Sequence, residues 1–329
     1  MQYVDKILGP LAPNRQAEST APRAKKVVVF NAHQEQGRSV CDALIKSNIW
    51  IVWGLVPDLQ HPSAQALQAM QVKVIVAGIE CPGSYERILE DKDGVFLHVD
   101  FESMLALKDD FTQAAEEEIR LTKLLVNACL QKDIKHLVYS TLDDLPGDDR
   151  VPHCHAKSEV VKYIKSTPLP TTFLYTSTPF SIIHHKELLK KRPKDEHYTL
   201  DLPLPDDLAL PGYPSEQTGE WAKAAFSKPQ RWVGKDMSAC TEHCTPVQMA
   251  ATLSAIFHHP VETSHVSKEA FYSPAHRSKI GEVAWSHYKA MYEGLVKRDV
   301  EFSESIVPTQ WNFKQWAKQD RKLKDIFEN

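Results

Sequence analysis

The chain has 329 residues, which is enough for one large α/β domain or two smaller ones. Hydrophobic residues make up 42% of the sequence and charged residues 25%, the ordinary balance of a soluble globular protein. The formal net charge of −4 argues against a protein that coats nucleic acid or binds a membrane surface through basic residues. We therefore expect no direct nucleic-acid partner and no membrane partner.

The first 24 residues contain prolines among scattered polar residues and lack the apolar core of a signal peptide. We interpret residues 1–24 as a loose N-terminal tail. The strong apolar run at residues 27–30 has the length of a strand and is far shorter than the ~20 residues of a membrane helix. These features predict a soluble protein of the cytoplasm, with the nucleus as a second location.

Apolar segments alternate with amphipathic ones between residues 25 and 180. The expected strands cover residues 27–30, 49–55, 72–76, 94–99, 136–140 and 171–175. The expected helices cover residues 39–47, 63–70, 85–89, 112–132 and 157–166. Strands and helices that alternate at this spacing indicate a parallel sheet covered by helices. The predicted fold class is α/β, with a Rossmann-type doubly wound parallel sheet formed by residues 25–180.

After residue 180 the alternation fades, and prolines become frequent between positions 203 and 214. We expect residues 181–329 to form a smaller α+β domain for a substrate or partner, parts of which return to the Rossmann sheet. Thr245 and Pro246 supply an N-cap and a first-turn proline, so a helix is expected over residues 245–258.

The six cysteines have no regular spacing, so we expect reduced thiols. Cys240, His243 and Cys244 lie close together, but their spacing matches no common zinc pattern and no second pair of ligands follows. We therefore expect no metal site.

The loop after the first expected strand is the candidate dinucleotide-binding loop. A Rossmann loop needs glycines for a tight turn, for close approach of the backbone to the pyrophosphate, and for packing of the helix on the sheet. In the G-x-x-G-x-x-G spacing, these positions hold Asn31, Gln34 and Gly37. Asn tolerates a positive φ. In contrast, the bulk of Gln34 and the charge of Glu35 oppose the binding of a dinucleotide.

The end of the second expected strand usually carries an acid for the ribose hydroxyls or a base for a 2′-phosphate. Here Leu55 is neutral and Asp58 lies a little late in the sequence, so NADP recognition is unsupported and NAD recognition depends on one poorly placed carboxylate. The candidate cofactor-binding residues are Asn31, His33, Gln34, Gln36, Gly37 and Asp58.

Several stretches resemble the NmrA-like family, atypical members of the short-chain dehydrogenase/reductase superfamily, and the resemblance covers most of residues 25 to about 300. The stretches that carry it are residues 27–40, 94–97, 135–140, 151–153 and 157–164. Loops of this family usually read G-A-T-G-x-Q-G or N-A-T-G-x-Q-A. This chain keeps the Asn31-Ala32 pair and Gln36 but departs at His33 and Gln34. The resemblance implies NADP or NAD as cofactor, while these departures and the neutral Leu55 predict weakened or lost binding.

Reductases of the superfamily use a Tyr-x-x-x-Lys pair, in which tyrosine is the acid and lysine holds the ribose and lowers the tyrosine pKa. The resemblance assigns Lys157 to the lysine. His153 stands at the tyrosine position, and loss of this tyrosine is typical of NmrA-like proteins. Ser140 and Thr141 end a strand on the cofactor side, where they are placed to hydrogen-bond a ligand carbonyl.

His153, His155, Lys157 and Ser140 are the candidate catalytic residues. Histidine can serve as an acid or a base near neutral pH, and the two histidines lie just before or in the first turn of a helix that borders the cleft. The alternative interpretation is a capped helix start with exposed polar residues. Cys154 has no nucleophile signature around it, so we expect an exposed and inert thiol.

Two functions remain open on the sequence alone. The first is a ligand-sensing or regulatory protein with a small-molecule ligand in the Rossmann cleft and a regulatory protein partner, since the family includes transcriptional co-regulators and redox sensors. The second is an enzyme of secondary metabolism. It would be either an NADPH-dependent reductase or a cofactor-independent isomerase or cyclase that uses His153 and Lys157 as acid/base groups.

Overall fold

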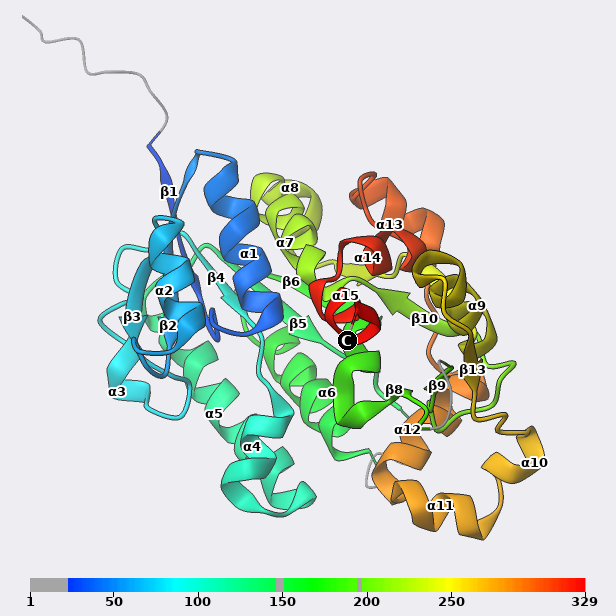
Figure 1. Cartoon of the computed structure of the whole chain (residues 1–329). Helices are drawn as coiled ribbons and strands as arrows, with labels where there is room; N and C mark the ends of the chain where they lie inside the picture. The colour runs from blue at the N-terminus through cyan, green and yellow to red at the C-terminus, as the bar shows by residue number, and fades with distance from the viewer. Residues whose placement is uncertain (1–22, 146–150, 194–196, 329) are drawn as a thin grey trace, which may run out of the picture.

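A parallel sheet forms the centre of the molecule (Figure 1). The computed structural model describes residues 23–145, 151–193 and 197–328, so the expected tail up to residue 22 lies outside the described residues. Within them, the sheet has seven strands in the order β3-β2-β1-β4-β5-β6-β11, all parallel to their neighbours. They are β1 (Lys25–Val29), β2 (Trp50–Val56), β3 (Lys73–Val76), β4 (Gly94–Leu97), β5 (His136–Thr141), β6 (Thr171–Thr176) and β11 (Asp236–Ala239). This order confirms the predicted doubly wound fold.

Helices cover both faces of the sheet, because neighbouring residues of each strand point to opposite faces. The helices of this part are α1 (Glu35–Lys46), α2 (Pro62–Ala69), α3 (Pro82–Tyr85), α4 (Phe101–Lys108), α5 (Phe111–Gln131), α6 (Pro152–Lys165), α7 (Thr218–Ser227) and α8 (Pro229–Trp232). On one face, Val28 of β1 belongs to the same buried core as Leu125 of α5. On the other, Val27 shares a core with Leu44 of α1 and Trp221 of α7.

The last strand and one covering helix come from the second half of the sequence. β11 pairs with β6, with Met237 opposite Leu174. α7 lies so close to α1 that a Cβ on Gly219 would overlap the backbone carbonyl of Ser39. The Ser39 hydroxyl accepts a hydrogen bond from the Gly219 N–H at 2.9 Å. The Rossmann core therefore depends on residues beyond 180.

The remaining elements form the C-terminal part. Two small mixed sheets have the orders β12-β10-β7 and β13-β9-β8 among the described residues. Their strands are β7 (Thr178–Pro179), β8 (Leu189–Lys191), β9 (Tyr198–Leu200), β10 (Leu210–Tyr213), β12 (Glu242–Cys244) and β13 (Val261–Thr263). The helices are α9 (Pro246–Phe257), α10 (Lys268–Phe271), α11 (Pro274–Ile280), α12 (Glu282–Tyr292), α13 (Val300–Ile306), α14 (Phe313–Gln319) and α15 (Arg321–Glu328), with 3-10 helices η2 (Phe180–Glu187) and η3 (Ser215–Gln217). Thr245 caps α9 as predicted, in a reciprocal pair of hydrogen bonds with Gln248.

Two helices begin earlier than expected. α1 starts at Glu35 instead of residue 39. No sequence signal marks this start, because the first turn is polar and the N-cap residue, Gln34, makes no side-chain cap. α6 starts at Pro152 instead of residue 157, so His153 and His155 lie inside the helix. Both shifts move candidate site residues from a loop onto a rigid helix.

One predicted helix was wrong and one helix was missed. The helix expected at residues 85–89 is replaced by the short α3, which ends at Tyr85. α4 was not predicted at all, although Asp100 caps it. No helix in the described ranges has the length and hydropathy needed to cross a bilayer.

Candidate functional site

The loop between β1 and α1 has the backbone of a dinucleotide-binding loop at its first and last fingerprint positions. Asn31 has φ of +51°, the left-handed conformation that Asn tolerates. Its side-chain amide donates to the His98 carbonyl at 3.0 Å, which ties the loop to the end of β4. At Gly37, a Cβ would overlap the Asn31 carbonyl, so only glycine lets α1 pack this closely on the loop.

The middle fingerprint position, which Gln34 occupies, differs from the usual glycine in the bulk of its side chain and in the contact that this side chain makes. Gln34 has extended backbone angles (φ −85°, ψ 164°) that any residue adopts, so glycine is not needed there for conformation. Its side-chain amide donates to Asp100 Oδ2 at 3.0 Å, and Asp100 also caps α4. β1 and β4 flank the crevice in which doubly wound folds bind dinucleotides. The Gln34 side chain thus bridges the two sides of that crevice.

Two carboxyl groups lie near the start of α1. Glu35, the first residue of the helix, accepts a hydrogen bond from Ser181 Oγ at 3.0 Å. Burial raises the pKa of the Glu216 carboxyl to about 7, and the nearby charge of Glu35 adds to this effect. A carboxylate is favourable at the positive end of a helix dipole. The protein's own acids therefore occupy a place that would attract phosphate in other Rossmann proteins.

A cavity of about 840 Å³ lies beside these acids. It is bounded by loop residues and by the C-terminal helices, with His33, Glu35, Arg38, Glu216, Trp311 and Trp316 among its lining residues. The His33 ring lies 5.8 Å from the His61 ring, measured between centroids. Burial lowers the pKa of His33, and the charge of His61 acts in the same direction.

The end of β2 offers little to a nucleotide ribose. Leu55 is 1% exposed and belongs to the core. Asp58 is exposed, and its carboxylate accepts a hydrogen bond from the Gln60 N–H at 2.9 Å within the turn. Asp58 therefore stabilises its own turn.

A second cavity, of about 710 Å³, lies at the carboxyl ends of β4, β5 and β6, where α6 and α12 face each other. We call it the main cavity because most of the candidate catalytic residues line it. Of the predicted catalytic residues, Ser140, His153 and Lys157 line it, whereas His155 is not among its lining residues. Gln36 lines it too and accepts a hydrogen bond from the Ser140 hydroxyl at 2.8 Å. This pair joins the first turn of α1 to the end of β5.

Lys157 is held by a buried ion pair. Its ammonium donates to Glu118 Oε1 of α5 at 2.5 Å and to the Val99 carbonyl at 2.8 Å. The side chains of Lys157 and Glu118 are 6% and 0% exposed. Lys157 therefore joins α6, α5 and the end of β4, and two of its three donors are engaged before any ligand binds.

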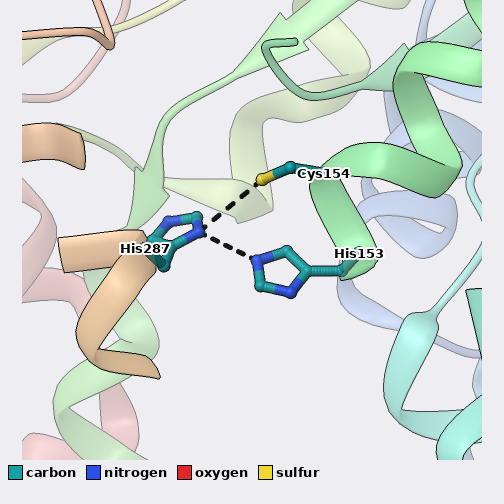
Figure 2. A group of neighbouring side chains, drawn as sticks. All are labelled: His153, Cys154 and His287. Carbon is teal, nitrogen blue, oxygen red and sulfur yellow. Dashed lines mark hydrogen bonds between the residues drawn. The ribbon is translucent and has the colours of Figure 1, made fainter. Parts of the chain in front are cut away.

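His153, which the resemblance places at the tyrosine position, has a partner that the sequence did not indicate. His153 Nε2 lies 2.8 Å from Nδ1 of His287, which projects from α12 (Figure 2). Burial lowers the pKa of His153 to about 3, and the nearby His287 adds to this effect. Burial likewise lowers the pKa of His287 to about 4, against the opposing charge of Asp143. Both rings are therefore neutral at physiological pH.

Cys154 completes this group. Its thiol lies 3.7 Å from His287 Nδ1. The residue is 1% exposed, so the expectation of an exposed thiol was wrong. The start of α6 buries Cys154 against Val151 and Ala290. No spacing signal links residue 154 to residue 287, because the contact depends on how α12 folds back onto α6.

Asp143 and Arg298 form a second charged pair in the same cavity wall. The Arg298 guanidinium binds the Asp143 carboxylate in two hydrogen bonds of 2.9 and 2.5 Å and also donates to the Thr176 carbonyl at 2.9 Å. Neither residue was predicted from the sequence. Arg298 lies more than a hundred positions from Asp143 and Thr176 in the sequence, so only the fold brings them together.

The sequence cluster near residue 240 does not assemble as a group. Cys240 and Cys244 are buried, and each thiol contacts a backbone carbonyl, of Glu242 and Thr245 respectively. His243 is exposed on β12.

Comparisons with known proteins agree with this fold. The model of the NmrA-like family matches residues 23–302. The nitrogen metabolite repression protein nmrA of Emericella nidulans is 29% identical over 171 residues, which cover 48% of this chain and 47% of that protein. The match thus spans about half the length of that curated relative.

Solved structures of NmrA, a negative transcriptional regulator, have the same fold. The crystal structure of its complex with NAD has a TM-score of 0.72 at 21% identity and covers 92% of this chain and 97% of that one. The structure of the complex with NADP has a TM-score of 0.71 at 22% identity, with the same coverage. Because the family model spans most of the sequence, the chain belongs to the NmrA-like family.

Proposed function

We propose that this protein is a ligand-sensing or regulatory protein in which NAD(P) binding is weakened or lost. The observation that carries the proposal is the hydrogen bond from Gln34 to Asp100, which crosses the crevice between β1 and β4. A dinucleotide pyrophosphate needs bare backbone at the middle fingerprint position. Here that position carries a side chain with a fixed partner, and the adjacent Glu35 would repel phosphate.

The ligand of such a protein would bind in the main cavity. Its volume of about 710 Å³ lies within the roughly 300–1,000 Å³ of small-molecule sites. The cavity is lined by Ser140, Thr141 and Lys157. These residues stay available to a small ligand although the loop does not suit a dinucleotide. A regulatory protein partner and a location in the cytoplasm or nucleus are in keeping with the Emericella relative, which is named for repression.

The enzyme alternative has less support. The superfamily's tyrosine is replaced by His153, whose ring is neutral and paired with His287. The ammonium of Lys157 is paired with Glu118. An acid/base role would have to break contacts that already satisfy these groups.

The substitution Gln34→Gly tests the proposal because it removes the bridge to Asp100 and restores the family's glycine. We expect the variant to bind NAD or NADP at least tenfold more tightly than the unmodified chain, measured by calorimetric titration, because the crevice opens. Gln71→Gly is the matched control. Gln71 is exposed on a turn before β3 with φ of +67°, where glycine fits, and its replacement should leave dinucleotide binding unchanged. If Gln34→Gly binds no better than the Gln71→Gly control, Gln34 does not block the crevice.

A further inference from the structure

We propose that His153, Cys154 and His287 form a binding site for a zinc ion, whose fourth coordination position is open to the main cavity. One ligand atom from each residue lies within 4.8 Å of the other two. Figure 2 shows the three side chains pointing toward one another from two helices, α6 and α12. This group is independent of the dinucleotide loop, so the inference goes beyond the proposed function.

The two distances to His287 are close to those of a tetrahedral zinc site, and the distance between the His153 and Cys154 ligand atoms is at most 4.8 Å. Zinc binds imidazole nitrogen at roughly 2.0–2.1 Å and thiolate sulfur at roughly 2.3 Å. Tetrahedral angles then place two nitrogens roughly 3.3 Å apart, and nitrogen and sulfur roughly 3.6 Å apart. The distance from Cys154 Sγ to His287 Nδ1 is 3.7 Å, and that from His153 Nε2 to His287 Nδ1 is 2.8 Å. Binding of zinc would separate the two rings by about half an ångström and bring the His153 and Cys154 ligand atoms to roughly 3.6 Å from each other, changes that side-chain rotations can supply.

The type of ligand favours zinc over magnesium and calcium. Two imidazoles and one thiol suit zinc, whereas magnesium and calcium require oxygen ligands. Three protein ligands with a fourth position left open are typical of zinc sites that bind water or a substrate. All three residues line the main cavity, so a ligand in that cavity could supply an oxygen or nitrogen to the ion.

The surroundings also resemble a supported metal site. Leu145, Val151 and Ala290 form an apolar cluster with Cys154, which limits access of solvent to the thiol. The Asp143 carboxylate lines the same cavity as His287 and is fixed by Arg298. Carboxylates just outside the ligands commonly orient metal-binding histidines.

The direct test is titration of the reduced full chain with Zn²⁺ by calorimetry and with Co²⁺ by absorption spectroscopy. We expect the chain to bind one equivalent of zinc with a Kd of about 1 µM or lower. Three protein ligands, one fewer than in a zinc finger, still contribute several kcal/mol of binding free energy. Bound Co²⁺ should show the absorption of a tetrahedral ion and a thiolate-to-cobalt charge-transfer band. The band reports a thiolate ligand in the unmodified chain, so detection of the site does not depend on whether variants fold.

Variants assign the ligands. Cys154→Ala and His287→Ala should each weaken zinc binding by about a hundredfold or more, because loss of a direct ligand exceeds the 10–100-fold effect of an outer-shell change. Two control variants should bind zinc as the unmodified chain does: Cys129→Ala, at another buried cysteine, and His243→Ala, at an exposed histidine. Absence of one-equivalent binding would show that the three residues form only a hydrogen-bonded cluster. Zinc binding that survives both Cys154→Ala and His287→Ala would place the ion elsewhere, and either result overturns the proposal.

Discussion

Lys157 and Arg298, the two basic residues of the main cavity, are each held in an ion pair with a carboxylate. Lys157 and Glu118 exclude almost all solvent from their contact, and a buried charge is tolerated only when it is paired. Removal of one partner leaves the other as an isolated charge in a low-dielectric environment. Lys157 therefore has a strong structural role, whatever ligand the cavity binds.

Glu118→Gln should lower the free energy of unfolding by about 3–5 kcal/mol, because it leaves the Lys157 ammonium without a counter-charge. Urea denaturation measures the change. The double replacement Glu118→Leu with Lys157→Met should recover most of the loss, since an apolar pair of similar volume removes both charges. As a control, Asp42→Asn breaks an exposed pair with Lys46 and should change the free energy by less than about 1 kcal/mol. Equal losses in Glu118→Gln and Asp42→Asn would contradict this account.

At the scale of elements, the junction of β1 with α1 combines a preserved backbone with altered side chains. Asn31 supplies the left-handed turn and Gly37 the close approach of helix to loop. Both could be predicted from the sequence because they depend on local backbone geometry. The bridge from Gln34 to Asp100 could not, because its partner lies 66 residues away and is brought near by the strand order.

Gly37→Ala should destabilise the protein by about 1–3 kcal/mol, because the added methyl group meets the fixed carbonyl of Asn31 and forces α1 outward. Thermal or urea unfolding provides the measurement. Gly83→Ala is the matched control: Gly83 is exposed in α3 and its Cβ would have open space, so the change should be neutral or slightly stabilising. A loss at Gly37 no greater than at Gly83 would show that α1 can move without cost.

At the scale of the whole molecule, residues from distant parts of the chain complete both the sheet and the cavities. Strand-helix alternation predicted the fold class, since each βα unit is a local pattern. It did not locate β11 as a sheet strand, because the sequence between β6 and β11 carries several elements of the C-terminal part. His287 and Arg298 were missed for the same reason: their partners on α6 and after β5 become neighbours only through tertiary packing.

Glu216 joins the Rossmann part to the C-terminal helices and gives the molecule a pH-dependent stability. Its carboxyl accepts a hydrogen bond from Trp316 Nε1 of α14 at 3.0 Å, and its pKa rises from 4.5 to about 7, first through burial and then through Glu35. Between these values the folded protein binds more protons than the unfolded chain. The free energy of unfolding should therefore fall as pH rises from about 4.5 to about 7.

Glu216→Gln should remove this part of the pH dependence and stabilise the protein by roughly 1–2 kcal/mol above pH 7, because the amide stays neutral. Urea denaturation at a series of pH values measures the effect. Glu220→Gln, on α7 beside Lys223, serves as the control and should keep the pH dependence of the unmodified chain. Parallel pH profiles for Glu216→Gln and the unmodified chain would contradict the role of Glu216.

Calorimetric titration of the unmodified chain with NAD, NADH, NADP and NADPH tests the central claim most directly. Because the Gln34 side chain bridges the crevice to Asp100 and Glu35 adds negative charge at the start of α1, we predict that all four bind with Kd no tighter than about 1 mM, a binding free energy weaker than about −4 kcal/mol. Binding of any one of them with a micromolar Kd would contradict the account.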